Sequence, residues 1–153
     1  FHRDLSDVRY TDACIYVPDI KIIKTDTDSP KRLPETRWQA VDVICCAAPN
    51  LREKPYNRMN PGEGRAIKVS NNELLDLHRQ RARKILSVAA ANNVDCLVLG
   101  AFGCGAFQND PNIIAQAYRN IFPEFDGYFR VIRFAVYCPP HDRTNFDVFR
   151  RLL

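Results

Sequence analysis

The sequence has little that points to a membrane, a metal ion or a disulfide-stabilised scaffold. Its 153 residues contain no signal-peptide pattern and no apolar run near the ~20 residues that a membrane-spanning helix needs. It has no Cys-x-x-Cys pair, and His2, His78 and His141 lie far apart without cysteine or acidic neighbours at ligand spacing. We therefore expect no metal ion, no cofactor and no membrane partner.

The cysteines also argue against a disulfide framework, although the chain has six of them. Four lie in or at the end of apolar, strand-like runs, which predicts buried free thiols in a reducing compartment. They are Cys45, Cys46, Cys96 and Cys138. We expect a cytoplasmic protein.

The chain has only a small excess of positive charge, because its 22 basic and 18 acidic residues give a formal net charge of +4. The two signs are interleaved, so no dedicated nucleic-acid surface is expected. The one basic run, Arg79 to Lys84, spreads around a helix and is interpreted as a solvated face. Length and an apolar fraction of 46% fit one domain over residues 1–153.

Hydrophobic periodicity and local punctuation predict alternating strands and helices. The helix over 70–93 begins at a capping box of Ser70 and Glu73, and the next begins at Asp110 and Pro111. The predicted strands are 13–24, interrupted at Pro18-Asp19, then 38–48, 96–99 and 129–137, and the predicted helices are 70–93, 111–122 and 145–153. The long stretch 51–69 is predicted to be a functional or disordered loop.

This order of elements predicts an α/β protein. Strands and helices that alternate from Trp38 onward imply right-handed crossovers, and hence a largely parallel sheet with helices on both faces. Ligands of such sheets bind beyond the carboxyl ends of the strands. Three loops, 48–50, 100–109 and 137–140, are therefore expected to share one rim.

The most informative stretch is 95–111, which combines a short apolar strand, a glycine-rich loop and a helix start. The unbroken apolar run 96–99 predicts a strand buried on both faces of the sheet. Glycines let backbone N–H groups approach a ligand closely, and a helix N-terminus adds partial positive charge, so the pattern suits a phosphate. It is not a Walker loop, and Gln108 replaces the third glycine of the dinucleotide fingerprint. A turn that merely needs positive φ is an equally good interpretation. We expect Phe102 in the core and Phe107 at the ligand.

Four stretches together resemble one family. Val98 to Pro111 closely resembles the second phosphate-binding loop of the bacterial-type poly(ADP-ribose) glycohydrolases, a branch of the macrodomain fold. Ile15 to Ile20, Ala47 to Asn50 and Phe134 to Tyr137 are similar to three further segments of that family in order and spacing. The resemblance implies a three-layer macrodomain-like fold with a largely parallel central sheet, incomplete at its N-terminus.

The resemblance also implies a ligand, which is ADP-ribose or an ADP-ribosylated protein or polymer. The diphosphate would lie on the backbone N–H groups of residues 103–106, and Phe107 would lie against the ribose next to the scissile bond. The substrate-binding residues expected on this basis are Gly103, Cys104, Gly105, Ala106, Phe107, Asn109 and Asn50.

One departure from the family concerns catalysis. Hydrolysis there depends on a Gly-Gly-Gly loop and a Gln-Glu-Glu pair, whereas this chain has no Gly-Gly pair and no adjacent glutamates. Its glutamates stand alone at Glu35, Glu53, Glu63, Glu73 and Glu124. No catalytic residue is therefore assigned. Because the chain begins with Phe1, we expect the carboxyl-terminal portion of a longer catalytic domain.

Three functions stay open. The first is the ADP-ribose-binding part of an ADP-ribosyl glycohydrolase that cleaves poly- or mono-ADP-ribose linkages. The second is a non-catalytic ADP-ribose-binding module. The third is a transferase or phosphatase that uses Cys104 as a thiol nucleophile at a helix N-terminus, although no arginine closes the loop as such a phosphatase requires.

Overall fold

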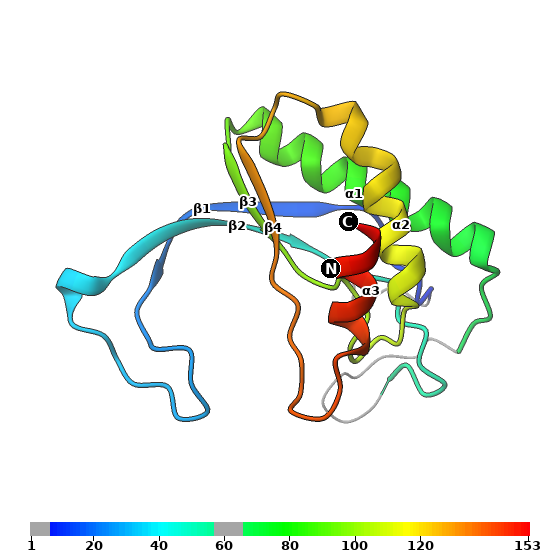
Figure 1. Ribbon diagram of the computed structural model, residues 1–153, viewed down its shortest axis with the longest axis horizontal. Helices are drawn as coiled ribbons and strands as arrows, with labels where there is room; N and C mark the ends of the chain where they lie inside the picture. Colours follow the sequence, from blue (N-terminus) through cyan, green and yellow to red (C-terminus); the bar gives the residue numbers. More distant parts are fainter. Residues whose placement is uncertain (1–6, 57–65) are drawn as a thin grey trace.

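The computed structural model describes residues 7–56 and 66–153 (Figure 1). His2, Glu63 and the centre of the predicted loop 51–69 lie outside the described residues. The strands are β1 (Cys14–Ile22), β2 (Gln39–Cys46), β3 (Cys96–Leu99) and β4 (Val131–Phe134). The helices are α1 (Asn71–Ala91), α2 (Pro111–Ile121) and α3 (Thr144–Leu152), with 3₁₀ turns η2 (Glu35–Arg37) and η3 (Phe122–Phe125).

Local sequence sets where the helices begin. The Ser70 hydroxyl accepts the backbone N–H of Glu73 at 3.2 Å and caps α1. The Asp110 carboxylate accepts the backbone N–H of Asn112 at 2.8 Å, and Pro111 follows as the first residue of α2. All three predicted helices are confirmed to within two residues at each end, and β4 is shorter than the predicted strand 129–137.

Strands β1 and β2 form an antiparallel hairpin that extends away from the helices (Figure 1). The register runs from Cys14 opposite Cys46 to Ile22 opposite Gln39. The predicted interruption at Pro18-Asp19 is confirmed, because the register shifts there and Asp19 has a φ of 56°. The hairpin is thus a twisted, irregular ribbon.

The α/β class is confirmed, but the predicted strand pairing is not what the described residues show. Only β3 and β4 are parallel, with Cys96 opposite Val131, whereas β2 pairs with β1 in the opposite sense. The expectation that β3 is buried on both faces is wrong, since Val98 is 74% exposed. Val98 lines a groove of about 1150 Å³ between β2 and β3.

The core lies where α1, α2 and α3 pack beside the β3–β4 pair. Leu86 of α1 and Ile114 of α2 are fully buried in this cluster. The Phe134 ring of β4 contacts Tyr118 and Phe149, with 5.3 Å between ring centroids in each case. These contacts fasten the end of β4 to both α2 and α3.

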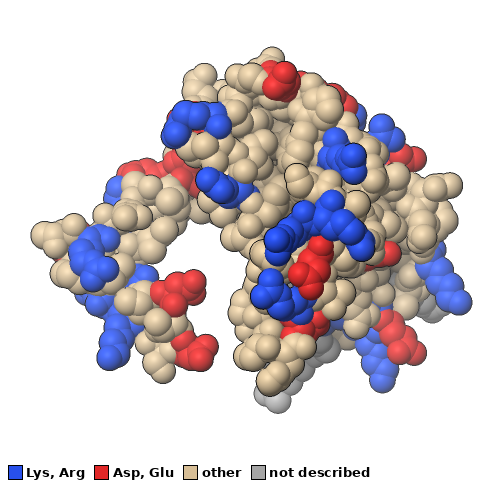
Figure 2. Space-filling model, in the orientation of Figure 1, with Lys and Arg blue, Asp and Glu red and all other residues tan. Residues whose placement is uncertain are grey.

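The sequence predicts that the basic run Arg79 to Lys84 on α1 is a solvated face, but the run is not wholly solvated. Arg81 is only 2% exposed and donates from Nη2 to the backbone carbonyl of Arg9. The expectation holds for Lys84, which is exposed, and Arg83 forms two 2.6 Å hydrogen bonds with Glu124. Figure 2 shows acidic and basic atoms interspersed over the face it presents.

The cysteine prediction is correct in part. All six thiols are free, but Cys45 and Cys96 are exposed, while Cys46 and Cys138 are half-buried. Strand alternation turns Cys45 to the opposite side from Cys46, which an apolar run cannot reveal. No helix in the described part of the chain is long and apolar enough to cross a membrane.

Candidate functional site

The glycine loop between β3 and α2 contains one position that only glycine can occupy. Gly103 has a φ of +78°, and a Cβ added there would lie 2.6 Å from Cβ of Ala48 and 2.7 Å from Nδ2 of Asn109. The interpretation of this stretch as a turn that needs positive φ is therefore correct for Gly103. It does not account for the rest of the loop.

The buried side chain of Asn109 fixes the glycine loop through hydrogen bonds. Its side-chain Nδ2 donates to the carbonyls of Pro49, Gly103 and Phe107 at 2.7, 3.0 and 3.3 Å. Its backbone N–H donates to the Gly103 carbonyl at 3.0 Å, and the residue is only 2% exposed. One buried amide thus ties both ends of the loop to the turn that follows β2.

His78 of α1 completes this hydrogen-bond network. Its Nε2 lies 2.9 Å from Oδ1 of Asn109, and because the Asn109 Nδ2 already donates to carbonyls, the histidine must donate to Oδ1. Its ring also meets the Phe102 ring edge-on at 5.9 Å. Burial lowers the pKa of His78 to about 4, which the hydrogen bond to Asn109 opposes and the Arg81 cation reinforces. His78 is therefore neutral near pH 7.

The turn after β2 and the glycine loop meet, as two of the three predicted rim loops should. The Leu51 N–H donates to the Phe107 carbonyl at 3.0 Å. Asn50 is fully buried, with Nδ2 donating to the Pro55 carbonyl at 2.8 Å and Oδ1 accepting from Nε of Arg52 at 3.2 Å. Tyr137, in the third predicted loop, is 83% exposed.

Three consecutive backbone N–H groups of the loop are free to bind a ligand. Within the part of the chain that the structure describes, the N–H groups of Gly105, Ala106 and Phe107 have no hydrogen-bond acceptor. Gly105 and Ala106 are exposed, and a Cβ added to Gly105 would meet nothing within 4 Å. The Cys104 N–H is different, because it donates to the Ala101 carbonyl at 3.0 Å. Consecutive free N–H groups of this kind form an anion-binding concavity.

The two phenylalanines have different surroundings. Phe102 packs against the core, as predicted. Phe107 is half-buried, with the Arg52 guanidinium 5.8 Å from its ring centroid and the Tyr10 ring 6.2 Å away. An aromatic ring and a cation therefore flank the open side of the loop.

Cys104 is poorly suited to act as a nucleophile. Burial, with the nearby Asp110 carboxylate, raises the pKa of its thiol to about 12. A thiol with this pKa stays protonated near neutral pH, whereas catalytic cysteines have lowered pKa values. This weakens the transferase or phosphatase hypothesis.

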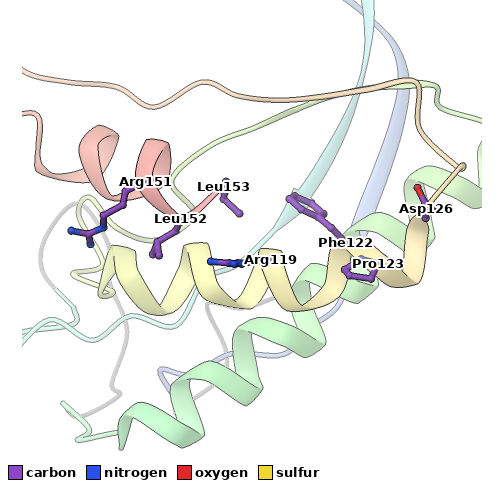
Figure 3. Close-up of a pocket in the computed structure, with 7 residues that line it drawn as sticks. All are labelled: Arg119, Phe122, Pro123, Asp126, Arg151, Leu152 and Leu153. Carbon is purple, nitrogen blue, oxygen red and sulfur yellow. The ribbon is translucent and has the colours of Figure 1, made fainter.

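A second depression, of about 660 Å³, lies beside α2 (Figure 3). Figure 3 shows residues of α2, η3 and the carboxyl-terminal end around it. They are Arg119, Phe122, Pro123, Asp126, Arg151, Leu152 and Leu153. None belongs to the glycine loop. Among the described residues, no three His, Cys, Asp or Glu side chains are grouped as metal ligands.

The sequence pattern predicts the glycine loop but not the buried positions of His78 and Arg81. Both occur where helical periodicity places one face of α1, beside Leu74 and Ile85, and both are buried there. The spacing of three and four residues was the available signal. The run Arg79 to Lys84, which includes Arg81, is predicted from the sequence to be a solvated face, and no position is predicted for His78.

Together, the strand, glycine loop and helix start define an α/β protein with a glycine loop that presents unpaired backbone N–H groups at the end of a parallel strand pair. No family model matches the chain, and no curated protein does. Solved structures do match: a poly(ADP-ribose) glycohydrolase from Deinococcus radiodurans, in complex with ADP-ribose, is 33% identical with a TM-score of 0.77. A poly(ADP-ribose) glycohydrolase from Thermomonospora curvata is 29% identical with a TM-score of 0.79, and it was also solved with the inhibitor ADP-HPD.

These matches confirm that the chain resembles the bacterial-type poly(ADP-ribose) glycohydrolases. It is a structural relative of that family. They cover 95% of this chain and 54% of the Deinococcus protein, and 96% of this chain and 49% of the Thermomonospora protein. The chain thus spans about half the length of these relatives.

Proposed function

We propose that this chain is the ADP-ribose-binding part of an ADP-ribosyl glycohydrolase. The observation that carries the proposal is the row of free N–H groups at Gly105, Ala106 and Phe107, on a loop that the buried Asn109 side chain fixes through hydrogen bonds. Backbone N–H groups fixed in this way bind phosphate oxygens without the entropic cost of ordering long side chains. The Deinococcus relative supports the choice of ligand, since it was solved with ADP-ribose.

The seven proposed site residues fall into two roles. Gly105, Ala106 and Phe107 would touch the ligand, through their N–H groups and the Phe107 ring. Gly103, Cys104, Asn109 and Asn50 would support the loop, because their polar groups are engaged within the protein or their space is filled. ADP-ribosylated proteins or polymers stay the proposed physiological partners, and a three-layer macrodomain-like arrangement stays a prediction.

No residue of this chain is proposed as the catalytic acid. Asp110 is the carboxylate beside the loop, and it caps α2 by accepting the Asn112 N–H. Glycosidic cleavage through an oxocarbenium-like transition state needs a carboxyl group placed at the scissile bond. In the proposed glycohydrolase, that group comes from residues other than those described here.

The proposal is tested by isothermal titration of the chain with ADP-ribose. Two informative variants are Gly105→Val, which fills the open space in front of the N–H groups, and Phe107→Ala, which removes the ring. Neither should disturb the fold, since Gly105 has no neighbour to strike and Phe107 is only half-buried. Gly103→Val is less informative, because its clash with Ala48 would also distort the loop.

Tyr128→Ala serves as the matched control, since Tyr128 is 63% exposed and precedes β4, at the opposite end of the strand pair from the loop. We expect wild type and Tyr128→Ala to bind equally, Phe107→Ala about tenfold more weakly, and Gly105→Val not measurably. Absence of binding by wild-type protein with native circular dichroism would overturn the proposal.

The second candidate is a non-catalytic ADP-ribose-binding module, which the isolated glutamates of this sequence favour. The two candidates differ in turnover. Incubation with an ADP-ribosylated protein, followed by chromatography for free ADP-ribose, separates them. Release by the protein that contains this chain supports the glycohydrolase, and binding without release supports the module.

A further inference from the structure

Cys14 and Cys46 are directly opposite each other at the base of the β1–β2 hairpin. In an antiparallel pair, the Cα atoms of opposite residues lie about 4.5 or 5.5 Å apart. Disulfides join Cα atoms separated by about 4.4–6.8 Å. The strand register alone therefore brings the two residues within bonding range without a shift of the backbone.

The side chains confirm that the two thiols are on the same side. The Cys14 thiol helps to raise the pKa of the Cys46 thiol, and both are half-buried against the hydrophobic core. Each thiol contacts a backbone carbonyl oxygen, that of Asp12 at 3.6 Å for Cys14 and that of Ala47 at 3.9 Å for Cys46. Cys46 also lines the groove between β2 and β3, so a small reagent can reach it from solvent. Cys45 is exposed on the other side of β2 and does not face Cys14.

We propose that Cys14 and Cys46 form a reversible intrachain disulfide when the chain meets a disulfide oxidant of the glutathione class. The first thiolate attacks the oxidant's S–S bond, forms a mixed disulfide and releases one thiol. The second cysteine then loses its proton and displaces the second thiol. Two cysteine thiols are oxidised, the oxidant is reduced to two thiols, and the two protons end on these leaving groups.

The surroundings of the pair decide how the exchange proceeds. Burial and the neighbouring Cys14 raise the pKa of Cys46 to about 12, so little Cys46 thiolate is present near neutral pH and the exchange is slow. The Arg81 guanidinium favours the thiolate and opposes this effect. Within the described residues, Nε and Nη1 of Arg81 have no hydrogen-bond partner, so they are free to accommodate a developing sulfur anion.

The link would close the loop from residue 14 to residue 46 and fix the base of the hairpin. Loop closure of this length restricts the unfolded chain, and it is expected to raise Tm by about 10 °C. Cys46 is also two residues before Ala48, whose Cβ limits the space at Gly103. The disulfide would therefore lie next to the turn that supports the glycine loop. The proposal itself does not depend on ADP-ribose binding.

The test is oxidation of dilute protein with glutathione disulfide for several hours, followed by thiol titration, non-reducing peptide mapping by mass spectrometry and thermal melting. The variants are Cys14→Ser, Cys46→Ser and the matched control Cys45→Ser. Cys45→Ser removes the adjacent thiol, so any link to the 46 position is assigned without ambiguity.

We expect wild type and Cys45→Ser each to lose two titratable thiols, to yield a peptide pair joined through Cys14 and Cys46, and to melt about 10 °C higher until reduced with dithiothreitol. Cys14→Ser and Cys46→Ser should form no such pair. Retention of all thiols by folded wild-type and Cys45→Ser protein would overturn the proposal, as would a link that involves other cysteines. Because Cys45→Ser changes an exposed residue, the answer does not depend on the folding of the other two variants.

Discussion

His78 and Asn109, 31 positions apart in sequence, share a buried hydrogen bond of 2.9 Å that joins α1 to the end of the glycine loop. The neutral imidazole donates to Oδ1, and the amide passes this constraint on through Nδ2 to Pro49, Gly103 and Phe107. His78 is buried on α1 and does not reach the surface of the site, yet through Asn109 it helps to fix the shape of the exposed loop.

Replacement of Asn109 by alanine should destabilise the protein by about 2–6 kcal/mol. The Gly103 and Phe107 carbonyls keep other donors, but the Pro49 carbonyl and His78 Nε2 lose their partners, and each buried orphan costs about 1–3 kcal/mol. Urea denaturation followed by circular dichroism measures the change. Gln116→Ala, on the exposed side of α2, should change stability by less than about 0.5 kcal/mol. Equal stability of the two variants would contradict the bracing role.

Stability should fall as the pH is lowered from about 6.5 to about 4, with a contribution from His78. Its pKa is about 4 in the folded chain and about 6.5 in the unfolded chain, so between these pH values the unfolded chain binds the extra proton. The neutral, buried His78 therefore raises the free energy of unfolding above pH 6.5 by about 3 kcal/mol relative to its value below pH 4.

The measurement is the free energy of unfolding at several pH values for wild type and His78→Gln. Subtraction of the two curves removes the carboxylates that titrate in both proteins. The difference should slope upward with pH over this window and flatten above it. Parallel curves would show that His78 does not titrate as inferred.

Two glycine substitutions in the same loop should have opposite outcomes. Gly103→Ala places a Cβ 2.6 Å from Ala48 at a φ of +78°, so we expect a loss of at least about 2 kcal/mol. Gly105→Ala meets nothing within 4 Å and should stay within about 0.5 kcal/mol of wild type. Thermal melts of the two variants decide the matter, and similar losses at both positions would contradict the loop geometry.

The isolated chain should melt at low temperature or self-associate. Strands β2 and β3 each have one strand partner among the described residues, and both line the groove where Val98 is 74% exposed. Exposed apolar strands pair with further chains, and a lysine on such a strand suppresses pairing. Sedimentation at increasing concentration should therefore show assembly for wild type and less for Val98→Lys. A monomer that melts cooperatively at all concentrations would refute this expectation.

Much of the local structure could be predicted because its causes are local. Ser70 and Asp110 cap helices through residues two or three positions away, and Pro18-Asp19 distorts β1 through its own backbone. The glycine loop was recognised for the same reason, and the positive φ at Gly103 is the conformation that glycine permits.

The strand pairing could not be predicted in this way. An apolar run indicates a strand but not its neighbour, so the alternation of elements predicted a largely parallel sheet, whereas β2 pairs with β1 across a long connection. The exposure of individual side chains could not be predicted either, because the apolar run 96–99 contains both buried Leu97 and exposed Val98.

The sequence by itself determined where the helices start, where the loop must bend and which family the motifs resemble, because capping, φ preference and motif spacing act within a few residues. Only the tertiary structure decided that His78 and Arg81 are buried, that Asn109 supports the loop and that Cys14 faces Cys46. Each of these depends on contacts between segments more than 30 residues apart. Such contacts form when burial and strand pairing outweigh the cost of loop closure, and no local pattern records that balance.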